Sequence, residues 1–304
     1  MNDILTRIDD RLEETVARLQ EFCRQPSIAA QGEGMAEMAE LVRRTLEQAG
    51  ADAELVPTGG YPVVLGRFAG RGSKTLMFYN HYDVQPPDPL ELWDSPPFAA
   101  KVRADHLYAR GVADNKGNLV ARLAAVEAWL SARGELPLNI LFVVEGEEEI
   151  GSPNLGTFAE EHRDKLQADG CIWETGYKDT KGRPEIMLGA KGILAVDLQV
   201  QTLGRDLHSA NAAIAESATW RLVWALNSLK GPDERICIPG FYDDVRPPDK
   251  RDRAMLADWD YDEAGELAEF GAEGFVLGLR GEALKERLLF QPTCNVCGFH
   301  AGYG

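Results

Sequence analysis

A histidine and a group of carboxylates stand where predicted secondary-structure elements begin or end. They are His81, Asp83, Asp114, Glu145, Glu147, Glu148, Glu149 and Glu174. Imidazole and carboxylate groups are the ligands with which proteins hold divalent cations such as zinc, and a free glutamate nearby can take a proton from water. These residue types therefore favour a dinuclear hydrolytic metal site, in which Asp83 orients the ring of His81. The alternative is a set of solvated loop charges.

The elements that would position these side chains follow an α/β pattern. Apolar runs over residues 75–80, 138–145 and 169–173 are typical of buried strands, and the helical spacing over 117–131 predicts a helix between the first two strands. Alternating strands and helices predict an α/β domain with a mostly parallel sheet. In such a sheet the carboxyl ends of the strands share one edge, where ligands usually bind. The histidine and the carboxylates should meet there.

The pattern changes near residue 189. Apolar and polar residues alternate over 193–203, as in a strand of a sheet with one wet face, and a helix is predicted over about 215–229. We therefore expect a domain boundary here, with an α/β domain over 1–188 and a smaller α+β domain over 189–304.

The composition narrows the classes of function. The chain has 304 residues and a formal net charge of −17, which argues against nucleic acid as a partner because phosphates are bound by Lys and Arg. No apolar run reaches the length of a membrane span, and no secretory signal is visible at the N-terminus. The odd number of cysteines, five, does not resemble a disulfide framework. We expect a soluble, cytoplasmic protein without nucleic acid or membrane partners.

Three ordered segments carry a resemblance to a known family. They are YNHYDVQP (79–86), LYARGVADNKGN (107–118) and VEGEEEIGS (144–152), and the sequence resembles the M20 metallopeptidase family through them. This family contains dipeptidases, carboxypeptidases, aminoacylases and related deacylases, and WDSPPF (93–98) looks like its dipeptidase branch. The resemblance implies a zinc-exopeptidase-like catalytic domain and a smaller lid domain through which a homodimer forms.

The resemblance also implies the ligands of two divalent metal ions, most often Zn²⁺, with Mn²⁺ or Co²⁺ as alternatives. His81 and Glu174 match the ligands of one metal, Glu149 matches a ligand of the other, and Asp114 matches the bridging carboxylate. In the family the residue after this aspartate is joined by a non-proline cis peptide bond. Asn115 occupies that position here, where aspartate is commoner.

The reaction implied by the resemblance is hydrolysis of an amide bond by a metal-bridged water. Glu148 matches the general base, and His208 matches a lid histidine that reaches the substrate from the partner subunit. We expect the peptide bond of dipeptides or small peptides to be cleaved. An N-acyl-amino-acid deacylase with the same metals and base is the closest alternative.

Family members carry a final histidine ligand of the second metal in a segment that follows the counterpart of Gly304. This sequence shows no counterpart, and His300 is a weak replacement because it lies in lid-like sequence. We therefore expect a C-terminally truncated form. A catalytically inactive, protein-binding relative is the alternative from another class of function.

Overall fold

The computed structural model describes residues 1–174 and 176–301, which fall into two units, Met1–Gly176 and Tyr177–Gly304. The predicted histidine and carboxylates of the metal site all belong to the first unit, and His208 belongs to the second. The assignment of residues 1–188 to a catalytic domain and 189–304 to a lid stays a prediction.

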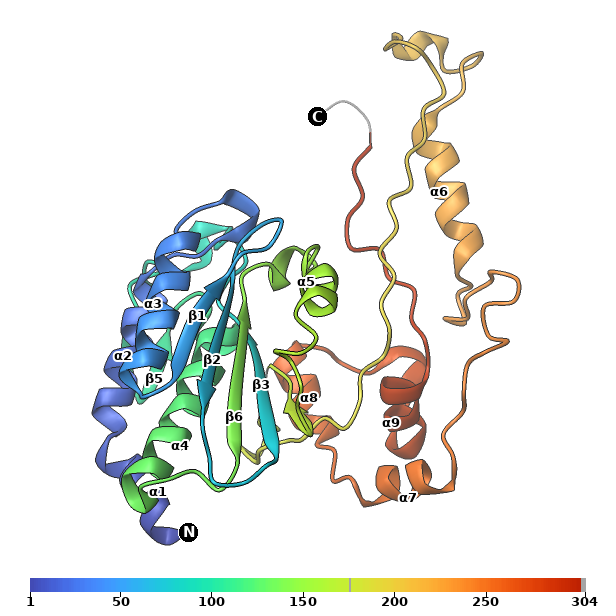
Figure 1. Cartoon of the computed structure of the whole chain (residues 1–304). Coiled ribbons are helices and arrows are strands. Elements are labelled where there is room, and N and C mark those ends of the chain that lie inside the picture. The colour runs from blue at the N-terminus through green and yellow to red at the C-terminus, as the bar shows by residue number, and fades with distance from the viewer. Residues whose placement is uncertain (175, 302–304) are drawn as a thin grey trace. The chain divides into compact units, whose positions relative to one another are not determined.

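A mixed sheet forms the centre of the first unit, with the strand order β1-β2-β6-β3-β7 (Figure 1). Its strands are β1 (Asp52–Val56), β2 (Val63–Phe68), β3 (Thr75–His81), β6 (Asn139–Glu145) and β7 (Gly170–Ile172). Strands β6, β3 and β7 are parallel, whereas β2 is antiparallel to both β1 and β6. The expectation of an α/β fold is confirmed, but the expectation of a mostly parallel sheet is wrong.

The length of the connections explains this difference. Residues 57–62, with the sequence PTGGYP, join β1 to β2, and so short a link can only return the chain antiparallel. Parallel strands need a crossover connection. The helix α4 (Gly117–Arg133) lies in the connection from β3 to its neighbour β6, and α5 (Leu155–Glu161) lies in the connection from β6 to β7 on the far side of β3. The glycine-rich link was a readable turn signal between two strand-like runs.

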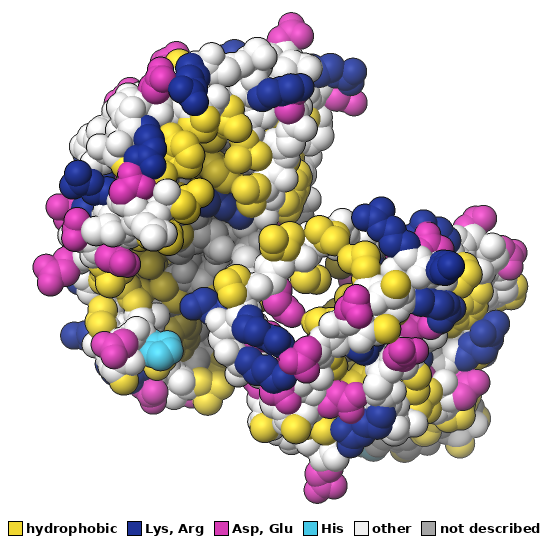
Figure 2. Space-filling view, turned by 90° about the horizontal axis from the view of Figure 1, so that it is seen from below, with side chains coloured by type: hydrophobic (Ala, Val, Ile, Leu, Met, Phe, Trp, Pro, Cys, Tyr) yellow, Lys and Arg dark blue, Asp and Glu magenta, His cyan; other side chains and the backbone are white. Residues whose placement is uncertain are grey.

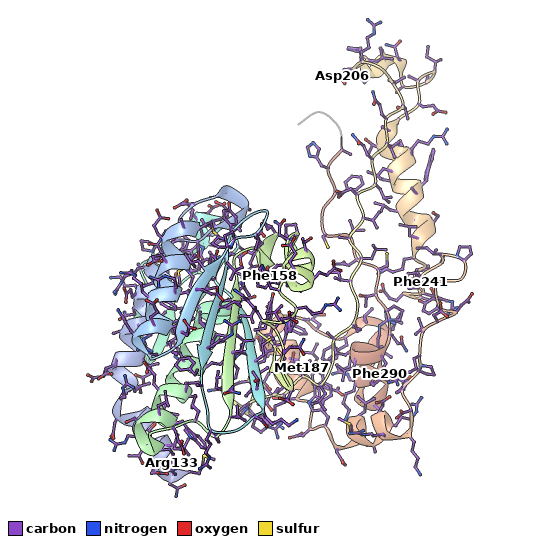
Figure 3. All side chains as sticks on the ribbon, in the orientation of Figure 1. Arg133, Phe158, Met187, Asp206, Phe241 and Phe290 are labelled. Atoms are coloured by element: carbon purple, nitrogen blue, oxygen red, sulfur yellow. The ribbon has the colours of Figure 1, made fainter. Side chains whose placement is uncertain are left out.

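Helices cover the two faces of this sheet unequally. The remaining helices of the first unit are α1 (Asn2–Asp10), α2 (Leu12–Arg24) and α3 (Met35–Gln48), and a small hairpin pairs β4 (Lys101–Arg103) with β5 (His106–Tyr108). On one face, Phe142 of β6 packs in a core cluster with residues of α2, α3 and α4. On the other face, Val143 of the same strand packs in a second cluster with Phe158. Phe158 lies on α5 and is labelled in Figure 3. Successive residues of β6 thus point to opposite faces, as the pleat requires.

The register of the parallel strands determines where the site lies. His81, the last residue of β3, is paired with Glu145, the last residue of β6. Strand β7 runs parallel on the other side of β3 and ends at Ile172, two residues before Glu174. The three strands therefore deliver their following loops to the same edge of the sheet.

Helices are the regular elements of the described part of the second unit. They are α6 (Ala218–Leu229), α7 (Lys250–Asp258), α8 (Glu263–Phe270) and α9 (Gly281–Phe290). Residues 193–203, expected to be a strand, have no strand partner among the residues that the structure describes. Alternation predicts which side chains share a face, but a strand also needs a hydrogen-bonded neighbour. The expected α+β character of this part is therefore not found in residues 177–301.

Apolar side chains lie at the surface alongside charged ones (Figure 2). In the second unit they include Ile193 and Leu194, which are almost fully exposed. None of the helices in residues 1–174 and 176–301 combines the length and hydrophobicity needed to cross a bilayer.

The packing of the sheet generates a stability prediction. Phe142 is fully buried, and its ring packs at 5.1 Å from that of Phe78 and 6.0 Å from that of Phe68. We expect Phe142→Ala to lower the free energy of unfolding by about 3–5 kcal/mol, because removal of a buried aromatic ring loses its packing contacts and leaves a cavity. Urea denaturation followed by circular dichroism measures this loss. Phe270→Ala is the control, since this phenylalanine is 62% exposed; equal losses in both variants would contradict the prediction.

Candidate active site

His81 is the buried centre of the candidate site. It ends β3, where its ring is fully enclosed. Its Nδ1 lies 3.1 Å from the carbonyl oxygen of Asp83 and 3.3 Å from Oδ1 of the same residue. Its Nε2 lies 2.9 Å from Oδ1 of Asp114. One ring nitrogen is therefore held by Asp83, and the other is directed at a carboxylate of a different loop.

Asp83 joins the loop after β3 to the loop after β6. Its carboxylate is buried, with Oδ1 accepting from the backbone N–H of Glu148 at 3.2 Å and Oδ2 accepting from that of Glu149 at 2.9 Å. The same side chain thus faces His81 and holds the acidic loop beside it.

The acidic run after β6 divides into two kinds of side chain. Glu145 accepts from the hydroxyls of Tyr79 and Ser152, and Glu147 accepts from the amide of Asn154 at 2.9 and 3.1 Å. Both are buried and engaged in the fold. Glu148 and Glu149 begin a short helical turn, Glu148–Ile150, and stay half-buried.

Three carboxylates approach the Nε2 edge of His81 together with Asp114. Oε2 of Glu148 lies 3.9 Å from Nε2, and Oε2 of Glu174 lies 3.7 Å from it. Glu149 contributes an oxygen within 4.8 Å of both His81 and Asp114. Oε2 of Glu174 is buried and has no hydrogen-bond partner among the described residues.

Two overlapping groups of ligand atoms could hold divalent cations. One comprises His81, Glu148 and Glu174, and the other comprises His81, Asp114 and Glu149; the ligand atoms within each lie no more than 4.8 Å apart. Oxygen and imidazole donors match the chemistry of zinc, and Oε2 of Glu174 is an acceptor that no donor reaches within residues 1–174 and 176–301. The residues therefore fit a divalent cation.

Burial and neighbouring charges shift the pKa values of these groups. Burial raises the pKa of Glu148 to about 7, and the carboxylates of Glu174 and Glu149 add to this shift against the attraction of His81. Burial would lower the pKa of His81, but hydrogen bonds to Asp114 and Asp83 outweigh it and raise the pKa to about 10. Without a cation, the imidazole thus carries the compensating positive charge. A metal ion would replace that proton, since only neutral imidazole is a ligand.

A short turn over Val112–Lys116 presents Asp114. Gly111 precedes it with φ +81°, and a β-carbon there would lie 2.5 Å from Val84, so a side chain would collide. At the other end, the buried Nζ of Lys116 donates to the carbonyls of Phe22 and Gln25 at the end of α2. The peptide bond between Asp114 and Asn115 is cis, which confirms the expectation from the resemblance.

Sequence reasoning missed the side chains that hydrogen-bond to Glu149, to Asn115 beside Asp114, and to the backbone of Glu174. Nε2 of Gln85 donates to the carboxylate of Glu149 at 2.9 Å and to its carbonyl at 3.0 Å. Asn80 of β3 donates to Asn115, and Arg122 of α4 reaches the backbone at Glu174. Gln85 and Asn80 lie inside the motif YNHYDVQP, which was the available signal. Arg122 had none, because a lone arginine on a helix normally faces solvent.

The candidate residues of the second unit are exposed. His208 precedes a single helical turn, Ser209–Asn211, and its Nδ1 accepts from the backbone N–H of Ala210 at 3.1 Å. His300 is also exposed. The roles of both residues toward a substrate stay predictions.

Comparison with known sequences supports the family. A family model described as peptidase family M20/M25/M40 matches residues 77–283. The chain is 31% identical over 258 residues to the Cys-Gly metallodipeptidase dug1 of Schizosaccharomyces pombe, covering 78% of this chain and 54% of that protein. It is 33% identical over 190 residues to the Beta-Ala-His dipeptidase of Homo sapiens, covering 61% of this chain and 38% of that protein. The chain spans about half the length of the curated relatives it matches.

Solved structures agree with the sequence comparison. The M20 family metallo-carboxypeptidase Sso-CP2 from Sulfolobus solfataricus matches with a TM-score of 0.90 and 42% identity, covering 96% of this chain and 66% of that chain. The dipeptidase Dug1p from Saccharomyces cerevisiae matches with a TM-score of 0.81 at 22% identity, covering all of this chain and 68% of that one, which shows the fold alone. The resemblance carried by the three motifs is confirmed, and the protein belongs to peptidase family M20/M25/M40.

Proposed function

We propose that the protein is a metal-dependent hydrolase that cleaves the peptide bond of dipeptides or other small peptides. The observation that carries this proposal is the convergence of carboxylates from separate loops on the buried ring of His81. The names of the dipeptidases among its relatives support the substrate class.

Two divalent cations, Zn²⁺ in the first instance with Mn²⁺ or Co²⁺ as alternatives, would be held by this cluster. His81 and Glu174 would bind one, Glu149 would bind the other, and Asp114 would bridge them. Asp83 would orient His81 through Nδ1, consistent with their 3.3 Å separation. When bound, the cations supply Lewis acidity that polarises the scissile carbonyl and favours ionisation of water near neutral pH.

Glu148 is the proposed general base. Its carboxylate lies beside the cluster, and its pKa of about 7 in the absence of a cation is near the operating range of a base at neutral pH. It would accept a proton from the attacking water and then deliver that proton to the leaving amine. Glu145 and Glu147 are less suited, because their oxygens accept hydrogen bonds within the fold.

His208 is proposed to contact the substrate from the partner subunit of a homodimer that forms through the lid. The surrounding segment GRDLHSANA (204–212), through which His208 matches the lid histidine, supports this role, and His208 is exposed. An imidazole in that position would donate to the oxygen of the scissile carbonyl as negative charge develops.

Two further substrate classes remain within the family chemistry. The similarity to Sso-CP2, described as a metallo-carboxypeptidase, favours removal of a C-terminal residue from longer peptides. An N-acyl-amino-acid deacylase would use the same cluster. A panel of Cys-Gly, β-Ala-His, an N-blocked dipeptide and an N-acyl amino acid separates these classes. No turnover of any member with zinc or manganese present would favour the inactive, protein-binding alternative.

The first prediction concerns metal binding. We expect His81→Ala to weaken zinc affinity by more than about 10–100-fold. Removing a residue that only hydrogen-bonds to a metal ligand already costs about that much, and His81 is proposed to be a ligand itself. Competition titration with a zinc indicator measures the affinity, and elemental mass spectrometry gives the stoichiometry. His106→Ala is the control, because this exposed histidine hydrogen-bonds only locally to the carbonyl of Ala104. Unchanged affinity in His81→Ala would refute the proposed ligand.

The second prediction separates catalysis from metal binding. We expect Glu148→Gln to lower kcat by about 10²–10⁴-fold, because the amide cannot accept the proton, while the zinc content is retained. Steady-state kinetics on the best dipeptide and elemental analysis of the same samples test both parts. Glu160→Gln removes an exposed carboxylate of α5 and should change neither quantity. Full turnover in Glu148→Gln would exclude it as the base.

The third prediction concerns the partner subunit. Glu148→Gln and His208→Ala should each be inactive alone, but hybrid dimers would contain one site with both native residues. Co-expression of the two variants with different affinity tags, followed by tandem purification, should recover part of the wild-type activity. Inactive hybrids of confirmed composition would rule out a contribution of His208 in trans.

A further inference from the structure

Arg122 is a partly buried cation that links three segments around the candidate site. It lies on α4, and its guanidinium is 5.7 Å above the ring of Phe78. Nη1 donates to the carbonyl of Tyr79 at 2.8 Å and to Oδ1 of Asn80 at 2.9 Å. Nη2 donates to the carbonyls of Trp173, at 3.2 Å, and Glu174. One planar fork therefore joins α4 to β3 and to the segment after β7.

The first arm of this link leads to Asp114. Asn80 is fully buried; its Oδ1 accepts from Arg122, and its Nδ2 donates to Oδ1 of Asn115. The amide of Asn80 accepts through its oxygen and donates through its nitrogen, so its orientation is set by both neighbours. Asn115 is also fully buried and follows Asp114 directly in the chain. The guanidinium thus restrains the residue beside the proposed bridging carboxylate.

The second arm leads to Glu174. Arg122 binds the backbone carbonyl of Glu174 itself, whose carboxylate faces His81 at 3.7 Å. The preceding ring, that of Trp173, stacks on Tyr79 with centroids 3.9 Å apart. Tyr79 in turn offers its carbonyl to Arg122. Within the described residues β7 pairs with β3 only as far as Ile172, and Arg122 donates to the carbonyls of the next two residues, Trp173 and Glu174.

We propose that Arg122 is a positioning residue that sets the separation of the metal ligands Asp114 and Glu174. It does so through Asn80 and Asn115 on one side and through the backbone of Glu174 on the other. The inference rests on the proposed function, since it requires the cluster to bind divalent cations. It assigns to Arg122 no contact with substrate or metal.

The test measures the geometry of the bound metal rather than turnover. Co²⁺ is titrated into the chelator-treated protein, and its visible absorption reports affinity and coordination. We expect Arg122→Met to weaken Co²⁺ binding by about 10–100-fold and to change the absorption spectrum, as loss of outer partners typically does. Arg122→Lys should lose less affinity. Its ammonium keeps the positive charge but cannot make all the hydrogen bonds that the planar guanidinium makes to β3 and to the segment after β7. Arg133→Met is the control: it is on the same helix, and its exposed ion pair with Asp3 is remote from these contacts (Figure 3).

The outcomes separate this inference from the proposed function. A folded Arg122→Met variant with the affinity and spectrum of the wild type would overturn the inference and leave the proposed function intact. Absence of Co²⁺ binding in the wild type would overturn both. If Arg122→Met does not fold, Arg122→Lys decides: unchanged affinity and spectrum would then refute the role. A purely structural role would lower the melting temperature without altering the spectrum.

Discussion

Mutual repulsion of carboxylates around one buried imidazole is the constraint on which the site depends. Asp114, Glu148 and Glu174 place their oxygens within 4 Å of Nε2 of His81, and Glu149 lies beside them. Such a group is unfavourable in a low dielectric unless a cation compensates it. The raised pKa values of His81 and Glu148 are the response of the metal-free cluster. A divalent cation would relieve the same repulsion, which is the physical basis of the proposed metal site.

The sheet makes this crowding possible. Parallel strands β6, β3 and β7 end at one edge, so the loops that follow them carry the acidic run, His81 and Glu174 to the same place. The helices of α4 and α5 provide the crossovers that keep these strands parallel. The antiparallel strands β1 and β2 extend the sheet away from the site and support it through the core around Phe142. The chemistry is thus confined to the parallel half of a mixed sheet.

A layer of neutral donors and one arginine orders the charged groups. The carboxylate of Asp83 accepts from the backbone amides of Glu148 and Glu149. Gln85 donates its amide to Glu149, and Arg122 donates its guanidinium to the backbone of Glu174. Hydrogen bonds also divide the acidic run, since Glu145 and Glu147 are engaged within the fold whereas Glu148 and Glu149 face the cluster. Neighbouring glutamates with the same intrinsic chemistry thereby acquire different surroundings.

The sequence by itself determined the α/β class, the strands that lead into the site and the family, because apolar periodicity and three motifs are local signals. It also brought His81, Asp83, Asp114, Glu148, Glu149 and Glu174 together as candidates, and the structure places them side by side. It did not determine the antiparallel half of the sheet, nor that residues 193–203 find no strand partner in the described part of the chain. Only the tertiary structure assigned Arg122, Asn80 and Asn115 to one connected set. Hydrogen bonds between residues far apart in the chain depend on which elements become neighbours, and no local pattern encodes that.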